Sequence, residues 1–273
     1  MFYFRGCAEE SRPPNQGMGN EMEAITTTAI GQGMVEIVVN RPPVNALDVA
    51  GWFELARQIT QAGEDPETRV VVLRSEGRGF NAGVDIKEMQ ATEGFDALIG
   101  ANRGCYAAFK AVYECKVPVI VAVHGYCLGG GIGLVGNADI IVASEDATFG
   151  LPEVERGALG AATHLARLVP AHKMRAMVYT AATATAQELH QYGSVHSVVP
   201  GDLLRETALD LARNIAEKRP GVIRAAKECL NGIDPVDVNR SYRFEQGFTF
   251  ELNLAGEGDA ARDEFVGKGK ESE

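Results

Sequence analysis

The sequence predicts an α/β fold followed by a helical C-terminal subdomain, on three observations. Continuous apolar, β-branched runs at residues 69–74, 117–123 and 139–143 are typical of strands that are buried on both faces of a parallel sheet. An amphipathic stretch lies between the runs at 69–74 and 117–123, as expected for the crossover helix that joins two parallel strands. Beyond residue 160 the helical period dominates and only one further strand is expected. We therefore expect one layered core with helices gathered at the C-terminal end.

The N-terminal part begins with residues 1–21, which carry two adjacent prolines and no hydrophobic period, so we expect a disordered extension. Two short strands are expected at 25–30 and 34–40, separated by Gly-Gln-Gly. Prolines then end the second strand. Asp48 is a suitable N-cap for a helix over 49–62, whose apolar residues fall on one face.

The central part is predicted as an alternation of strands and helices. The strand at 69–74 runs into a glycine-rich loop over 75–85, which leads to a helical turn at 86–90 and a long amphipathic helix over 93–114. The segment 151–157 is predicted as a loop or first helical turn that carries two carboxylates. The other expected elements are strands at 148–150 and 194–199, and helices at 132–136, 163–168, 171–182, 186–192, 202–218, 222–230, 236–254 and 259–266.

Composition and charge exclude several classes of protein. The 273 residues are 45% apolar and 23% charged, enough for a sizeable buried core. A net charge of −11 argues against nucleic acid as a partner. No apolar run approaches the roughly 20 residues of a membrane helix, and the N-terminus lacks the apolar region of a secretion signal. The five cysteines are scattered without zinc or redox spacing. We expect a cytoplasmic protein with reduced thiols, no bound metal and no membrane contact.

Three consecutive glycines, Gly129 to Gly131, stand where the strand at 117–123 turns toward a short helix. Without Cβ atoms, the backbone there can be approached closely. The N–H groups at a helix N-terminus also carry about half a positive charge between them. Such a place suits an anion, or a carbonyl oxygen that becomes one during a reaction. The alternative interpretation is a tight turn without a ligand.

Three segments together resemble the crotonase superfamily of enoyl-CoA hydratases and isomerases. They are GFNAGVDIKEM at 79–89, HGYCLGGG at 124–131 and FGLPE at 149–153. The resemblance implies a crotonase fold, in which a spiral of ββα units over 22–200 is followed by a helical subdomain over 201–273 that serves oligomerisation and covers the substrate. It also implies an acyl-CoA thioester as substrate, no permanently bound cofactor, and a homotrimer or homohexamer.

The resemblance also assigns catalytic roles. In the family, two backbone N–H groups form an oxyanion hole for the thioester oxygen, and the matching residues are Val84 and Gly130. Hydratases of the family use two glutamates, of which Glu153 matches the second. The first follows the glycine triplet by two residues, and this position is Gly133. Because concerted addition of water needs two positioned carboxylates, simple hydratase activity is disfavoured.

Further segments resemble a group within this superfamily, the ring-opening hydrolases of actinobacterial steroid catabolism. They are EGF at 93–95, ANRGC at 101–105, the stretch 152–165 and EQGFTFELNL at 245–254. Those enzymes act on the CoA thioester of a bicyclic methyl-dioxo-hexahydroindene. The resemblance implies a retro-Claisen reaction, in which water adds to a ring ketone and a ring C–C bond breaks. The electrons then delocalise into the thioester as an enolate held by the oxyanion hole.

One base that activates water suffices for this reaction. Glu153 is the first candidate, with a structural carboxylate as the alternative. Glu155 is the second, although its neighbour Arg156 favours an ion-paired orienting role. Glu245 lies in an aromatic-rich helix and could line an apolar pocket, or it could be an exposed or inter-subunit carboxylate.

The remaining candidates contact CoA or the acyl group. Lys87 is expected to meet a CoA phosphate, unless it is a solvated surface lysine, and Asp85 could instead brace its loop. The two histidine candidates, His124 and His164, could instead be hydrogen-bonded core or wall residues. The CoA candidates are Asn45, Ala46, Phe80, Ala82, Asp85, Ile86 and Lys87, and the substrate-pocket candidates are His124, Leu128 and His164.

Three other functions remain open at this point. An enoyl-CoA isomerase could work with Glu153 alone, and a hydratase-like lyase of fatty acid or sterol β-oxidation is a related alternative. The run GIGLVG at 131–136 matches a dinucleotide-binding fingerprint, although a loop separates it from the preceding strand. A crotonase-like assembly protein without activity is the third alternative.

Overall fold

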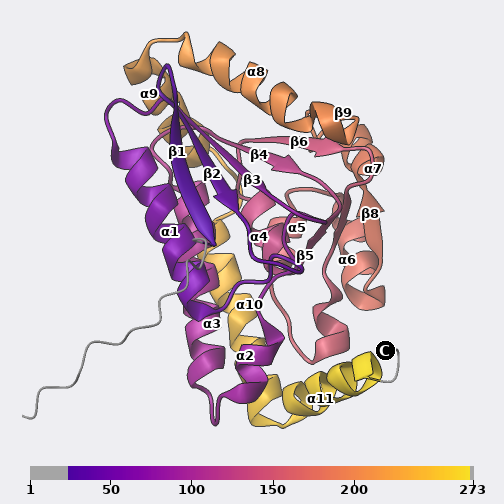
Figure 1. Cartoon of the computed structure of the whole chain (residues 1–273). Coiled ribbons are helices and arrows are strands. Elements are labelled where there is room, and N and C mark those ends of the chain that lie inside the picture. Colours follow the sequence, from indigo (N-terminus) through magenta and orange to yellow (C-terminus); the bar gives the residue numbers. More distant parts are fainter. Residues whose placement is uncertain (1–23, 271–273) are drawn as a thin grey trace, which may run out of the picture.

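The computed structural model describes residues 24–270, which form two sheets surrounded by helices (Figure 1). The predicted extension at 1–21 lies outside the described residues. None of the helices within 24–270 combines the length and the apolar character needed to span a bilayer.

The large sheet has six strands in the order β1-β2-β3-β4-β6-β9. Its strands are β1 (Ile25–Gly31), β2 (Met34–Val39), β3 (Val70–Ser75), β4 (Val119–Val123), β6 (Ile140–Ser144) and β9 (Ser197–Val199). Only the β1–β2 pair is antiparallel, and the other neighbours are parallel. All residues of β4 are buried, because helices cover both faces of the sheet, as the continuous β-branched runs predict.

Helices cover the two faces of this sheet unequally. On one face lie α1 (Val49–Glu64) and α3 (Asp96–Tyr113), and on the other lies α8 (Leu204–Ala216). The N-cap prediction for α1 is confirmed, because the Asp48 carboxylate accepts a hydrogen bond from Gly51 N at 2.7 Å. The larger core, on the α1–α3 side, adjoins the functional site described below.

A small second sheet lies beside the carboxyl ends of the large one. It consists of β5 (Tyr126–Leu128), β7 (Thr148–Gly150) and β8 (Thr183–Thr185). Isolated bridges, Leu47 with Val84 and Asn81 with Cys127, continue the layer toward the N-terminal part. Successive passes of the chain therefore add a strand to the large sheet, a short strand or bridge to the small layer, and then a helix. This repetition is the predicted spiral of ββα units.

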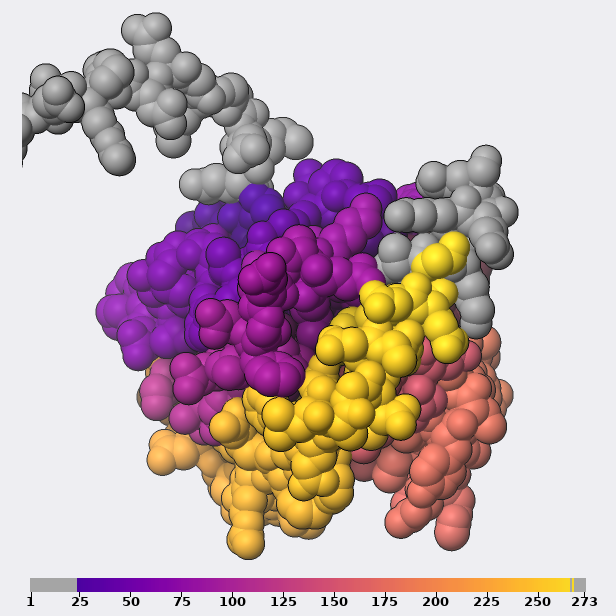
Figure 2. Space-filling view, turned by 90° about the horizontal axis from the view of Figure 1, so that it is seen from below, coloured from indigo at the N-terminus to yellow at the C-terminus, as the bar shows by residue number. Residues whose placement is uncertain are grey.

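The remaining elements lie around these layers. They are α2 (Ile86–Ala91), α4 (Gly130–Val135), the 3₁₀ helix η1 (Pro152–Arg156), α5 (Ala162–Leu165), α6 (Ala171–Thr180), α7 (Ala186–Gln191), the 3₁₀ helix η2 (Gly201–Leu203), α9 (Pro220–Gly232), α10 (Val238–Leu254) and α11 (Glu257–Lys270). In Figure 2, the yellow C-terminal helices lie between the magenta region that includes α2 and α3 and the salmon region that includes α6.

Several expected boundaries were wrong. The segment after β4 was expected to be loop but contains β5, and β8 was not expected at all. The helix expected over 163–168 ends at Leu165. The strand expected over 194–199 begins only at Ser197, where pairing with β6 starts. The strands β5, β8 and β9 depend on pairing with distant parts of the chain, which local pattern does not encode.

Candidate active site

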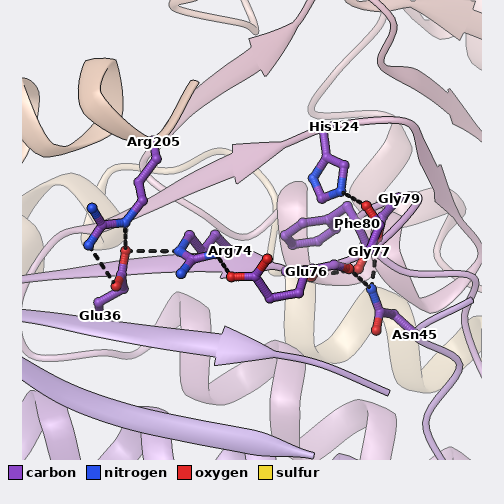
Figure 3. Close-up of polar contacts among 10 residues, drawn as sticks. Glu36, Asn45, Arg74, Glu76, Gly77, Gly79, Phe80, His124 and Arg205 are labelled. Carbon is purple, nitrogen blue, oxygen red and sulfur yellow. Dashed lines mark hydrogen bonds and ion pairs between the residues drawn. The ribbon is translucent and has the colours of Figure 1, made fainter. Parts of the chain in front are cut away.

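The loop after β3 is held from both sides by hydrogen bonds to its carbonyl groups (Figure 3). The Asn45 side-chain amide donates to the carbonyl oxygens of Glu76 and Gly79, at 2.7 and 2.8 Å. His124 Nε2 lies 2.9 Å from the carbonyl oxygen of Gly77. Asn45 and His124 therefore position this loop, while their contacts with CoA and the acyl group stay predictions.

Backbone pairing at the end of this loop orients Val84. Leu47 N donates to the Gly83 carbonyl at 3.0 Å, and Asp85 N donates to the Leu47 carbonyl at 2.9 Å. Since successive peptide groups in an extended chain point to opposite sides, the N–H of Val84 faces away from Leu47. Within residues 24–270 this N–H donates to no other group. It is therefore available to a ligand.

The second glycine-rich loop brings Gly130 N beside Val84. Gly83 has a φ of +89°, and a Cβ placed there would lie 3.1 Å from Gly130 N. Only glycine combines this φ with such a close approach at no steric cost. Gly130 is the first residue of α4, so its N–H has no partner within the helix, and no residue of the described chain accepts from it. The two N–H groups therefore lie close to one another without protein acceptors, and their role as an oxyanion hole stays a prediction.

Glu153 lies against the same glycine loop. A Cβ at Gly129, whose φ is +57°, would stand 2.6 Å from Glu153 Oε1. Glu153 Oε2 is buried and has no hydrogen-bond partner. Burial raises the pKa of this carboxyl to about 7, against smaller lowering effects from its own backbone N–H and from the charge of Arg156. A carboxyl with this pKa can take up and release a proton near neutral pH, as a general base must.

The position of the absent hydratase glutamate is filled by an aromatic ring. A Cβ at Gly133 would come within 2.2 Å of Phe109 Cζ, so no side chain fits there while Phe109 keeps its place. The ring of Phe109 packs edge-on against Trp52, with centroids 5.7 Å apart. Glu153 is therefore the carboxylate left beside the predicted oxyanion hole.

These groups line one cavity. The predicted residues that line it are Ala82, Val84, Ile86, Gly130 and Glu153. Arg156, Cys105 and Tyr242 were not predicted but also line it, together with apolar residues of α2 and α3. Arg262 of α11 completes the wall, so a C-terminal helix contributes to the cavity.

Glu155 lies outside this cavity. Its side chain is exposed, and it forms no ion pair with Arg156 or any other described residue. The expected Glu155–Arg156 pair was therefore wrong. In a 3₁₀ helix with three residues per turn, adjacent side chains point about 120° apart, so Arg156 faces the cavity while Glu155 faces solvent.

Glu245 holds the start of α5. Its carboxylate accepts hydrogen bonds from the N–H groups of Ala162 and Thr163, at 2.8 and 2.6 Å, and from the Thr163 hydroxyl. It also lines an apolar pocket beside the cavity, with the exposed rings of Phe244 and Phe248. Its cap bonds give it a structural role, while the predicted catalytic role has no geometric support at Glu245 itself.

His164 and Leu128 do not line the cavity. His164 is 1% exposed and packs against the rings of Phe109 and Tyr242, with centroids 5.1 and 5.0 Å apart. Burial lowers the pKa of His164 to about 3, so its ring is neutral at physiological pH. It lies behind the cavity wall rather than in it.

The predicted CoA residues occupy different environments. Phe80 is 1% exposed, so its side chain belongs to the core. Asp85 caps α2, accepting from Lys87 N at 3.0 Å, which matches the bracing alternative. Lys87 is exposed and Ala46 half-buried, and their contacts with CoA stay predictions. Within residues 24–270, no three or more His, Cys, Asp or Glu side chains gather as metal ligands would.

Comparison with known proteins gives close relatives. The chain is 66% identical over 246 residues to the "(7aS)-7a-methyl-1,5-dioxo-2,3,5,6,7,7a-hexahydro-1H-indene-carboxyl-CoA hydrolase" of Rhodococcus jostii, covering 90% of this chain and 95% of that protein. It is 67% identical over 244 residues to the protein of the same name from Mycobacterium tuberculosis, covering 89% of this chain and 99% of that protein.

The fold also matches solved structures. The crystal structure of an enoyl-CoA hydratase/isomerase from Pseudoalteromonas atlantica T6c superposes with a TM-score of 0.79 at 24% identity, covering 90% of this chain and 98% of that one. This likeness shows the crotonase fold. The sequence model described as enoyl-CoA hydratase/isomerase matches residues 29–253, and the chain therefore belongs to the enoyl-CoA hydratase/isomerase family.

Proposed function

We propose that this enzyme opens a ring of a bicyclic, steroid-derived CoA thioester by hydrolysing a C–C bond. The 66–67% identity to hydrolases named for a methyl-dioxo-hexahydroindene-carboxyl-CoA supports the substrate class. The observation that carries the reaction type is the ring of Phe109 in the place of a second carboxylate. A site with one carboxylate facing an oxyanion hole suits activation of a single water molecule.

The mechanism uses three groups of this chain. Glu153, ionised above about pH 7, removes a proton from water, and the water oxygen attacks a ring ketone. The C–C bond between that carbonyl carbon and the conjugated ring then breaks. Its electron pair moves through the double bond onto the thioester oxygen, where the N–H groups of Val84 and Gly130 stabilise the enolate.

The alternatives have less support. Hydration is disfavoured because Gly133 cannot carry a side chain beside Phe109. Double-bond isomerisation also needs one carboxylate, but the relatives at 66–67% identity bear the hydrolase name. The run at 131–136 lies in the buried helix α4 and its cap rather than in a phosphate-binding loop, which argues against a dinucleotide enzyme.

Incubation with the bicyclic CoA thioester tests the proposal. We expect a ring-opened carboxylate whose mass exceeds that of the substrate by one water, detected by mass spectrometry. Glu153→Gln should lower kcat by roughly 10² to 10⁴, the usual contribution of a general base. Absence of the carboxylate product, combined with rapid migration of a 3-enoyl-CoA double bond, would instead favour the isomerase.

The assembly and setting of the enzyme are also proposals. We expect a cytoplasmic homotrimer or homohexamer that meets CoA only as part of its substrate. The exposed aromatic residues Phe244 and Phe248 on α10 are the kind of surface that an assembly would cover. Analytical ultracentrifugation would give the oligomer number directly.

A further inference from the structure

The cavity wall contains an arginine side chain that, within residues 24–270, has no hydrogen-bond or ion-pair partner. Arg156 stands three residues after Glu153 on η1, and side chains i and i+3 of a 3₁₀ helix project from the same side. Both residues line the cavity. Arg156 Nε is buried without a hydrogen bond, and the guanidinium forms no ion pair within residues 24–270. Its close contact is the face of Phe265 in α11, with the ring centroid 4.4 Å from Cζ.

The other cation of the cavity is already engaged. Arg262 Nη2 donates to Asn253 Oδ1 at 2.7 Å and also pairs with Asp259. A buried donor without a partner is costly, so an unpaired guanidinium at a cavity indicates a ligand oxygen. Of these two arginines, Arg156 is therefore the one with free donors for a substrate.

The proposed reaction, on which this inference rests, creates negative charge at two separate oxygens. One is the thioester oxygen, which the N–H groups of Val84 and Gly130 receive. The other is the ketone oxygen under attack, which a conjugated ring bond separates from the thioester. The oxyanion hole cannot hold both oxygens at once, so ketone attack calls for a second group that stabilises charge.

We propose that Arg156 is a catalytic residue that binds the oxygen of the attacked ring ketone and then holds the carboxylate product. The positions of Glu153 and Arg156 fit these roles. Glu153 contacts the glycine loop at Gly129, and Arg156 follows Glu153 on the same side of η1. Glu153 is therefore beside the predicted oxyanion hole, and Arg156 lines the same cavity. A guanidinium also matches the product, since its fork of N–H groups binds a carboxylate with two parallel hydrogen bonds.

Water gives one proton to Glu153 and forms a C–O bond to the ketone carbon, and the carbonyl π pair moves onto the ketone oxygen beside Arg156. That oxygen reforms the double bond, while the C–C σ pair leaves into the conjugated system and reaches the thioester oxygen. The enolate carbon finally takes the proton held by Glu153, and the new carboxylic acid ionises beside Arg156. The sum is substrate plus water.

Two reactions of this enzyme distinguish the role of Arg156 from the roles of Glu153 and the oxyanion hole. Ring opening needs all the groups named above. Exchange of deuterium from D₂O into the ring-opened product, at the carbon of the former C–C bond, needs only the oxyanion hole and Glu153. In Arg156→Gln we expect kcat for ring opening to fall by about 10² to 10³, the usual cost of one oxyanion-stabilising donor. Exchange at saturating product should stay at the wild-type rate.

Matched variants exclude a structural explanation. Arg240→Gln, which changes an exposed arginine of α10, should leave both reactions intact. Phe265→Leu keeps Arg156 but removes the ring beneath it, and should retain most ring opening. If Phe265→Leu matches the loss in Arg156→Gln, or if Arg156→Gln loses exchange as well, Arg156 only braces α11 and the proposal fails.

The remaining outcomes are also decisive. If the wild type opens the ring and Arg156→Gln is equally active, the role of Arg156 is overturned but the proposed function stands. No ring opening by the wild type overturns the proposed function itself. If Arg156→Gln melts below the assay temperature, Arg156→Lys replaces it, because the shorter ammonium cannot form the forked contact. A loss of ring opening with intact exchange then supports the proposal, and full ring opening contradicts it.

Discussion

At the scale of the residue, the site depends on a carboxyl that folding keeps partly protonated. Glu153 is held in an apolar cavity with an unpartnered oxygen, and burial raises its pKa from 4.5 to about 7. This base is stronger than a solvent-exposed carboxylate, which favours removal of a proton from water. Ionisation of this buried carboxyl destabilises the folded state, because a charge is less favourable in the interior than in water.

Stability and activity should respond to pH in opposite directions through this one group. Because the folded pKa lies above the unfolded value, the cost of ionising Glu153 is absent below about pH 4.5 and grows until the pH passes about 7. Urea unfolding should therefore show Glu153→Gln more stable than the wild type at pH 8, by up to about 3 kcal/mol. This advantage should vanish near pH 4.5.

Over the same range, kcat/KM of the wild type should rise about tenfold per pH unit below pH 7 and level off above it. A pH profile that is flat between pH 5 and 8 would contradict the role of Glu153 as the base.

At the scale of the element, η1 carries the side chains of Glu153 and Arg156, for which we propose catalytic roles, and α11 packs against it. Gly157 ends η1 with a φ of +63°, and a Cβ there would lie 2.7 Å from both the Glu257 carbonyl oxygen and Gly258 Cα. The glycine thus permits both the left-handed turn and the approach of α11. The orientation of Arg156 toward Phe265 depends on this packing.

Gly157→Ala should displace α11 and loosen the cavity. We expect a loss of stability of about 1 to 2 kcal/mol from the left-handed φ alone, measured by urea unfolding. The KM for the bicyclic thioester should rise, since α11 contributes Arg262 to the wall. Gly221→Ala, at a helical position with open space and no positive φ, is the matched control; it should leave KM unchanged and should not lower stability, since alanine favours a helix over glycine. An unchanged KM in Gly157→Ala would show that α11 does not shape the cavity.

The hydrophobic pattern of the sequence predicted the long helices and strands but not the contacts between side chains of different elements. Continuous β-branched runs identified β3, β4 and β6, since burial on both faces leaves a clear local mark. The three-residue strands β5 and β8 were not predicted, because the strand with which they pair, β7, lies far along the chain from each of them.

Val84, Gly130 and Glu153 were predicted as site residues through family resemblance, and the structure brings them to one cavity. Arg156 was missed because its neighbour Glu155 suggested an ion pair, whereas the tight 3₁₀ turn directs the two side chains apart. No local pattern shows that Phe109 meets Gly133, because that contact joins two different helices.

At the scale of the whole molecule, a buried carboxylate joins the C-terminal helices to the sheet. Glu36 of β2 is 5% exposed and pairs with Arg74 of β3 at 2.9 Å and with Arg205 of α8 at 2.7 Å (Figure 3). Burial raises the pKa of Glu36, but hydrogen bonds from Arg205 and Arg74 outweigh it and hold the pKa below 4.5. The division of the chain at residue 200 stays a prediction, while α8 itself packs on the outer face of the sheet.

Glu36→Gln should weaken this connection by about 1 to 3 kcal/mol at pH 7, as expected for charged hydrogen bonds. Because the folded pKa is lowered, the wild-type advantage is complete above about pH 4.5 and disappears as the pH falls through the folded value. Urea unfolding at pH 7 and pH 3 measures this change. Arg213→Gln, which breaks exposed pairs on α8, should shift stability by less than about 0.5 kcal/mol. Equal effects of the two variants would contradict the special role of Glu36.

The ring of Phe109 in the space beside Gly133 also bears on how such an enzyme can change during evolution. A glutamate at 133 alone collides with the ring, and a smaller residue at 109 alone leaves a void in the core. Each single step toward water addition across a double bond is therefore harmful before the second occurs. Proteins that descend from one with this arrangement would therefore pass through a less fit intermediate before gaining hydratase activity. We expect them to retain the proposed C–C bond hydrolysis even when their substrates differ.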